Sequence, residues 1–169
     1  MTKHGIWIID DKKEVKLLRK NMAPFDFSKY TQKDIRELLK KMREAKKKAN
    51  GIGLSANQIG LDANLFIAQV EGKFYAVFNS QLSKISEETN VIEEGCLSVP
   101  DVFGDVSRPS RVVLDGYDKN GKRLKIKAWG LLARVFQHET DHLNGIVFID
   151  KAKKLHTYEL QENGPAVAI

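Results

Sequence analysis

Residues 137–145 read QHETDHLNG, and His138, Glu139 and His142 within them form an H-E-x-x-H pattern. On a helix, side chains four positions apart lie on the same face, so the two imidazoles point in one direction. Paired histidines with a glutamate beside them typically bind a catalytic metal, and the glutamate handles a proton. A catalytic centre takes three protein ligands and keeps one position open. The stretch therefore predicts a metal-binding helix and requires a third ligand elsewhere.

The histidine pair belongs to a longer helical segment, which we expect to run from about Gly130 to Leu143 and to end at Asn144-Gly145. At about 100° per residue, Leu131 and Val135 fall within about 60° of the two histidines, so an apolar stripe continues along the metal face. Glu139 lies about 100° round from the first histidine. That offset suits a carboxylate that transfers a proton without ligating the metal.

Candidate donors for the third metal position occur both before and after this helix in the sequence. The downstream donors, which belong to no motif, are Asp150, His156, Glu159 and Glu162. Upstream, Cys96 is the only cysteine of the chain, which excludes an intramolecular disulfide. A lone cysteine is a buried thiol, a nucleophile or a metal ligand. As a thiolate, Cys96 would complete a three-ligand site with one open position.

The bulk composition is that of one globular domain. The chain has 169 residues, of which 42% are apolar and 30% charged, and this length suffices for one substantial core. It has no apolar run of the roughly 18–20 residues that a membrane helix needs, and no signal-peptide pattern at its N-terminus. We therefore expect a single domain over residues 1–169, in the cytoplasm, with no membrane partner.

Positive charge is concentrated in one predicted helix. Residues 33–48 include eight basic and three acidic residues, within a chain of net charge +6. Thr31 and Asp34 resemble a capping box, apolar residues recur at helical spacing over 35–49, and Asn50-Gly51 suits the end of the helix. Such a face could contact nucleic acid or the ribosome. A solvated helix surface is favoured, because no nucleic-acid motif accompanies the charge.

The middle of the chain has the pattern of antiparallel strands. Two hairpins are expected: 64–70 with 74–79 around EGK, and 111–117 with 122–129 around DKNG. In the last strand, Leu124, Ile126 and Ala128 alternate with basic residues, which indicates one buried face and one solvent-exposed face. Together with the two helices, these hairpins predict an α+β fold.

A glycine-rich turn, GIGLSANQ at 51–58, directly follows the basic helix. It lacks the lysine and the spacing of phosphate-binding and dinucleotide-binding loops. Taken in order with EGCLS at 94–98 and QHETDH at 137–142, it resembles the motifs of the peptide deformylase family. This family removes the formyl group from the N-terminal methionine of new bacterial or organellar proteins. The similarity extends over roughly residues 15–150.

The resemblance implies a metallo-hydrolase with a deformylase-like fold. In that fold, antiparallel β-sheets surround a central helix that carries H-E-x-x-H, and one long amphipathic helix lies near the N-terminus. The implied metal ligands are Cys96, His138 and His142. The resemblance assigns proton transfer to Glu139, and stabilisation of the oxyanion to Gln58 and the backbone N–H of Leu97. The products would be formate and a free N-terminal methionine.

For the substrate, the resemblance implies a methionine pocket beside the metal. Its implied apolar walls are Ile52, Ile92, Leu131 and Val135. The backbone of Gly53 is expected to pair with the extended peptide as an added strand. Asp141 is expected to orient the metal site through Arg108, with an ordinary surface ion pair as a nearly equal alternative.

The implied donor set accepts one divalent ion, either Fe²⁺, Zn²⁺, Ni²⁺ or Co²⁺, and the resemblance makes Fe²⁺ the expected native metal. The expected partners are formylmethionine N-termini of peptides and, transiently, the ribosome. We expect a monomer and no specific nucleic acid. The expected location is the cytoplasm. For a virus-encoded protein this would be the cytoplasm of the host cell, and an organellar location is an open alternative.

The chain departs from the family pattern at several points. Ser55 stands where the family usually has Ala and could add a hydrogen bond, and Asn79-Ser80 replaces a common Asn-Pro. After about residue 150 the tail is short, so we expect the C-terminal helix of many bacterial members to be shortened or lost here. Two other functions remain alternatives: a zinc peptidase whose third ligand lies downstream, and a basic RNA-associated domain with a structural metal.

Overall fold

The computed structural model describes residues 4–157. Its helices are α1 (Glu14–Leu18), α2 (Gln32–Lys48) and α3 (Gly130–Leu143), with the 3-10 turns η1 (Phe27–Lys29), η2 (Ala56–Ile59) and η3 (Phe148–Asp150). Its strands are β1 (Gly53–Ser55), β2 (Leu65–Val70), β3 (Lys73–Ile85), β4 (Thr89–Cys96), β5 (Val99–Pro109), β6 (Arg111–Tyr117), β7 (Arg123–Trp129) and β8 (Leu155–Thr157). Among these helices, none has the length and apolar character that crossing a bilayer requires.

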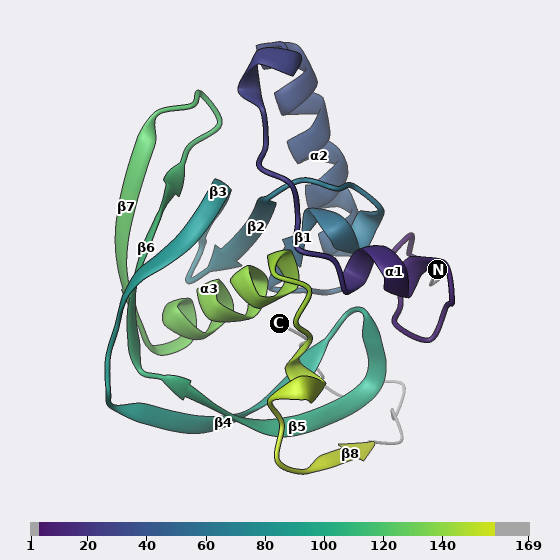
Figure 1. Ribbon diagram of the computed structural model, residues 1–169, viewed down its shortest axis with the longest axis vertical. Helices are drawn as coiled ribbons and strands as arrows, with labels where there is room; N and C mark the ends of the chain where they lie inside the picture. Colours follow the sequence, from purple (N-terminus) through teal and green to yellow (C-terminus); the bar gives the residue numbers. More distant parts are fainter. Residues whose placement is uncertain (1–3, 158–169) are drawn as a thin grey trace.

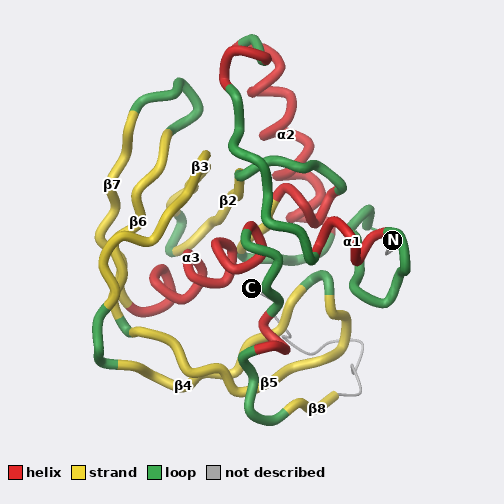
Figure 2. The backbone as a smooth tube through the Cα atoms, viewed as in Figure 1, coloured by secondary structure: helices red, strands yellow, loops and turns green. Residues whose placement is uncertain are grey.

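The described strands form two antiparallel sheets around α3 (Figures 1 and 2). The larger has the order β1-β2-β3-β6-β7, and the smaller has the order β4-β5-β8. Alternate side chains of β2 point to opposite sides, so Leu65 and Ile67 pack with α2, whereas Phe66 and Ala68 pack with α3. The larger sheet is therefore held between the two long helices, which keeps α3 at the centre of the molecule.

Helix α2 begins with the predicted cap. The Thr31 hydroxyl accepts a hydrogen bond from Asp34 N at 3.1 Å, and the Asp34 carboxylate accepts one from Thr31 N at 2.8 Å. Removing an N-cap of this kind typically costs about 1 kcal/mol. The apolar face of α2 is buried against the sheet. Lys46 also turns inward, where its Nζ donates to Gly51 O at 3.1 Å and ties the end of the helix to the glycine-rich turn.

Both predicted hairpins are present, with different limits. Strands β2 and β3 turn through Glu71 and Gly72, whose φ angles of 50° and 77° are those of a two-residue hairpin. Strand β3 continues to Ile85, beyond the predicted end at Asn79. At Asn79 the φ angle is 51°, the register with β6 shifts, and the side chain bonds to the backbone of Phe25. This irregularity interrupts the sequence pattern although the strand goes on.

The hairpin of β4 and β5 has no counterpart among the strands predicted from the sequence. Val91 and Ile92 are exposed although both are apolar, so β4 lacks the alternation that reveals a half-buried strand. The hairpin turns after Cys96 and pairs that residue with Val99. It places the EGCLS motif next to α3, which positions Cys96 for the site described below.

Candidate metal centre

Three buried donor side chains converge beside the C-terminal half of α3. His138 and His142 lie one turn apart on this helix, and Cys96 comes from the end of β4. The Cys96 Sγ and His142 Nε2 atoms are 3.1 Å apart. Ligand atoms of all three residues lie within 4.8 Å of one another. The upstream cysteine is therefore the donor that the fold brings to the two histidines.

The downstream donors point elsewhere. Asp150 forms an ion pair with an arginine at the end of α1, and His156 Nε2 lies 2.7 Å from Glu93 Oε2. Glu159, Glu162 and most of the short tail lie outside the described residues. Within residues 4–157, the metal-ligating group contains no residue downstream of α3. Nothing in that range supports the zinc-peptidase alternative.

The chemistry of the three donors fits a divalent metal. His138 Nε2 is buried and makes no hydrogen bond of ordinary length within residues 4–157, whereas most buried polar atoms have a partner. Burial alone would lower the pKa of His138, but the neighbouring Cys96 and Glu94 raise it to about 10. Burial and the charge of His138 hold the pKa of His142 well below its usual value. A metal ion would take the place of the proton on His138.

Glu94 is a buried carboxylate next to His138, and the sequence analysis assigned it no role. It accepts hydrogen bonds from Arg108 Nε at 2.6 Å, Arg108 Nη2 at 2.9 Å and Arg134 Nη1 at 2.6 Å. His138 Nδ1 donates to it at 3.0 Å. Burial would raise the pKa of Glu94, but Arg108 and His138 hold it well below its usual range. Because Nδ1 of His138 is engaged, Nε2 is left for the metal.

The expected contact between Asp141 and Arg108 is present. Arg108 Nη1 donates to Asp141 Oδ2 at 2.7 Å, and Lys151 Nζ donates to the same oxygen at 2.6 Å. Because Arg108 also holds Glu94, a continuous chain of contacts runs from Asp141 to His138. The expected contact chain exists, and a role of Asp141 in orienting the metal site stays a prediction.

Glu139 is a second buried carboxylate and lies beside the histidines on α3. Its Oε2 accepts a hydrogen bond from Ser55 Oγ at 2.6 Å, so the departure at position 55 does add a bond. Burial raises the pKa of Glu139 to about 7, against the lowering effects of the His138 charge and Ser55. A carboxyl group with such a pKa can both take and give a proton near neutrality. Gly53 passes so close that a Cβ there would overlap Glu139 Oε1.

The two predicted oxyanion donors border the three ligands. Gln58 Oε1 accepts a hydrogen bond from Ser55 N at 2.8 Å, which directs its amide group towards Ser98 Oγ at 3.1 Å and Cys96 Sγ at 3.7 Å. Leu97 follows Cys96 in the turn between β4 and β5, and its side chain packs with the cluster beneath α2. Their part in catalysis stays a prediction.

The four residues assigned to the methionine pocket differ in exposure. Val135 is buried, and Ile52 packs against the cluster that contains it. Ile92 and Leu131 are each 45% exposed, so neither is an ordinary core residue. Leu131 and Val135 lie on successive turns of α3, as their helical spacing predicts. Their contact with a substrate stays a prediction.

Cys96→Ala is expected to abolish tight metal binding, because two neutral imidazoles without a thiolate do not complete a three-ligand site. Metal analysis of anaerobically purified protein measures the loss, and thermal unfolding checks that the variant folds. His156→Ala, which removes a downstream donor, is the control and should retain one metal ion per chain. Stoichiometric metal in Cys96→Ala, or its loss from the control, would contradict the upstream ligand.

Comparisons with protein families, with named relatives and with solved structures all lead to peptide deformylases. Residues 6–158 match the polypeptide deformylase family. A peptide deformylase of Treponema pallidum is 48% identical over 87 residues, 52% of this chain and 54% of that protein, so the chain spans about half of that relative's length. A peptide deformylase of Prochlorococcus marinus is 42% identical over 139 residues, 78% of this chain and 68% of that protein. The crystal structure of peptide deformylase from Thermotoga maritima has a TM-score of 0.80 at 33% identity and covers 88% of this chain and 97% of that one.

Proposed function

This chain belongs to the polypeptide deformylase family, and we propose that it hydrolyses the N-formyl group of formylmethionine at the N-terminus of nascent polypeptides and releases formate. The observation that carries the proposal is the buried group of Cys96, His138 and His142 with Glu139 beside it. Three ligands leave a coordination position for chemistry, and a fourth buried group that is not a ligand can move the proton.

The reaction follows from the positions of these side chains. The residues that would hold the metal are Cys96, His138 and His142. When bound, the metal supplies Lewis acidity and lowers the pKa of water. Glu139, held by Ser55, takes the proton of the attacking water and delivers it to the departing amine. The Gln58 amide and the Leu97 N–H are proposed to stabilise negative charge on the formyl oxygen, where loss of one donor typically costs about 10²–10³ in rate.

The substrate is proposed to bind between the sheet edge and the start of α3. Strand β1 lies at the edge of the larger sheet, so an extended peptide can pair with Gly53 as an added strand. The proposed wall for the methionine side chain is Ile52, Ile92, Leu131 and Val135. The exposure of Ile92 and Leu131 is compatible with this assignment, because both side chains are accessible to a substrate.

The remaining features of the proposal concern the metal, the partners and the location. Fe²⁺ is proposed as the native ion, and Zn²⁺, Ni²⁺ and Co²⁺ suit the same donors. The protein is proposed to be a monomer with one catalytic domain over residues 1–169, to act in the cytoplasm and to contact the ribosome transiently. The exposed basic side chains of α2 support the ribosome contact through their charge.

The direct test is formate release from a formyl-Met tripeptide under anaerobic conditions. The metal-loaded protein should release one formate for each deformylated peptide and leave the peptide bonds intact. An acetyl-Met tripeptide of the same sequence is the matched substrate control and should react much more slowly. No formate from protein that carries one metal ion per chain would refute the proposed activity.

Ser55→Ala is expected to raise the pKa of Glu139, because it removes a hydroxyl that donates to the carboxylate. Glu139 would then lose its proton, and so act as a base, only at higher pH. The acidic limb of the kcat/KM profile should therefore move to higher pH. Measurement of kcat/KM across pH for both proteins tests this, with metal content as the control. An identical profile would show that Ser55 does not tune Glu139.

A further inference from the structure

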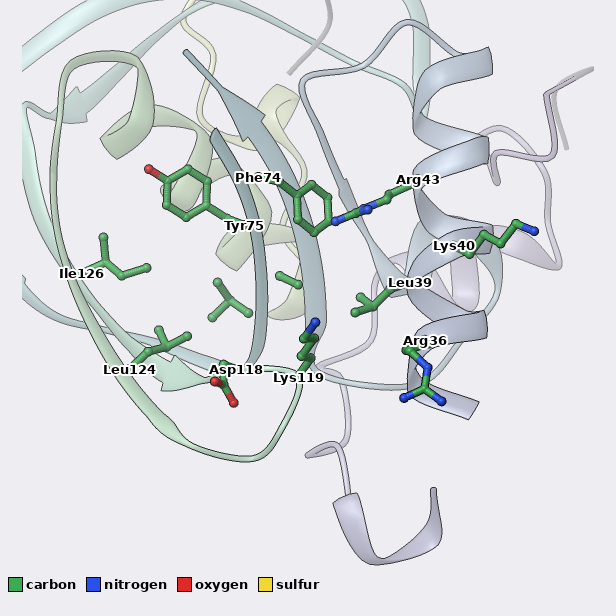
Figure 3. Close-up of a pocket in the computed structure, with 12 residues that line it drawn as sticks. Arg36, Leu39, Lys40, Arg43, Phe74, Tyr75, Asp118, Lys119, Leu124 and Ile126 are labelled. Carbon is green, nitrogen blue, oxygen red and sulfur yellow. The ribbon is translucent and has the colours of Figure 1, made fainter. Parts of the chain in front are cut away.

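A hollow of about 580 Å³ lies between α2, the first half of β3 and the hairpin of β6 and β7 (Figure 3). None of the residues that line it belongs to the metal centre or to the proposed methionine pocket. Its apolar lining includes Leu39, Phe74, Tyr75, Leu124 and Ile126. The hollow explains why Leu124 and Ile126, on the inward face of β7, are only half-buried. Its size is within the range of ligand-binding pockets, about 300–1,000 Å³.

One wall of the hollow is an unpaired strand edge. Strand β2 pairs with β3 from Lys73 onward, but the pairing of β3 with β6 begins only at Phe78, opposite Tyr117. Residues 73–77 therefore have β2 on one side and no strand on the other within the described chain. In Figure 1 the start of β3 stands apart from the hairpin of β6 and β7.

The backbone groups on this edge can be identified from the register. The two-residue turn makes Val70 and Lys73 a hydrogen-bonded pair, and such pairs alternate along antiparallel strands. Lys73, Tyr75 and Val77 therefore bond to β2. Phe74 and Ala76 direct their N–H and C=O groups towards the hollow, and each offers one donor and one acceptor there.

The other wall carries positive charge. Arg36, Lys40 and Arg43 recur four and three positions apart, so they form one stripe on α2. The Arg43 guanidinium lies over the Phe74 ring at 3.5 Å from its centroid, and Lys119 adds a charge from the opposite hairpin (Figure 3). The acidic residue in the lining, Asp118, caps its own turn by accepting from Asn120 N and Lys122 N at 2.8 and 2.9 Å.

We propose that this hollow docks an extended acidic segment of a partner protein, which adds as a strand to the open edge of β3. The partner's backbone pairs with Phe74 and Ala76, and its acidic side chains lie against the basic stripe of α2. Its apolar side chains cover Leu124 and Ile126. Nucleic acid would satisfy the charges, but it lacks the alternating donors and acceptors, spaced about 6.8 Å apart, that an antiparallel strand edge presents. The proposal stands independently of the deformylase activity.

Binding is tested with an acetylated, fluorescent peptide of alternating Glu and Val, added to the full-length, metal-loaded protein and followed by anisotropy. The same peptide N-methylated at every residue keeps its charge but has no backbone N–H to donate along either strand edge. We expect the unmodified peptide to bind, and the methylated peptide to bind at least tenfold more weakly. Equal binding of the two would overturn strand addition. Absence of binding by the unmodified peptide would overturn the docking site itself.

Matched variants of α2 locate the site. Arg36→Glu combined with Lys40→Glu reverses the charge of the stripe and should weaken binding at least tenfold. Lys41→Glu combined with Lys48→Glu makes the same charge change on exposed positions that lie about 80° or more from Arg36 and Lys40 around the helix, and should bind as the wild type does. Similar losses in both variants would show that net charge, and not this hollow, attracts the peptide.

Amide hydrogen exchange provides a readout specific to strand addition. The bound peptide should slow exchange at Phe74 and Ala76, whereas Tyr75 and Val77 already bond to β2 and should change little. An oligouridylate is the competing ligand in the same assay. If it binds as tightly as the peptide and no amide of β3 is protected by either ligand, the hollow is a nucleic-acid surface and the proposal is wrong.

Discussion

Glu139→Gln is expected to lower the rate of formate release by about 10²–10⁴-fold, the usual contribution of a positioned acid or base. The amide that replaces the carboxylate has the same shape and can still accept the hydrogen bond from Ser55. It cannot take a proton from water, however, and it cannot return one to the departing amine. The measurement is kcat on a formyl-Met tripeptide, at equal metal content for the two proteins.

The metal content separates this prediction from its alternatives. Glu139 lies beside the ligands but is not one of the three converging donors, so the variant should retain one metal ion per chain and a similar KM. A basic RNA-associated domain with a structural metal predicts no dependence of function on Glu139. Full activity in a metal-loaded Glu139→Gln protein would therefore remove the carboxylate from the mechanism.

Glu94→Gln is expected to lower the free energy of unfolding by about 3–5 kcal/mol, the range for removing one partner of a buried ion pair. Glu94, Arg108 and Arg134 are all buried, and Glu94 accepts hydrogen bonds from both arginines and from His138. A neutral amide removes the carboxylate with which the buried Arg134 pairs, and it leaves the buried Arg108 with Asp141 as its counter-charge. Chemical unfolding at one fixed metal concentration measures the effect.

The pH dependence of this loss follows from the direction of the Glu94 pKa shift. The folded pKa lies below the usual 4.5, so the carboxylate contributes its full stability above about pH 4.5 and loses it as the pH falls towards the folded value. The difference between wild type and Glu94→Gln should therefore be constant near neutrality and shrink in acid. Glu88→Gln removes an exposed partner of Arg111 and is the control, with little change expected. A loss as small as that of the control would show that the buried network is not stabilising.

Local patterns predicted the elements whose causes are local. Side chains four residues apart share a helix face in any fold, so His138 and His142 could be paired before the structure was known. The Thr31 cap and the β2–β3 turn likewise depend on neighbours within a few residues. Cys96 could be singled out because it is the only thiol and stands in a motif. The extension of β3 and the β4–β5 hairpin were missed because a positive φ at Asn79 and exposed apolar residues in β4 disturb the expected alternation.

The sequence by itself determined the metal-binding helix, the capped basic helix, the antiparallel strands and the family. Only the tertiary structure decided which distant groups meet. Glu94 lies between two arginines and His138, Ser55 reaches Glu139, and β3 keeps an open edge beside α2. The physical reason is that these contacts join residues 14 to 84 positions apart or depend on where two strands diverge. A short-range periodicity carries no information about either.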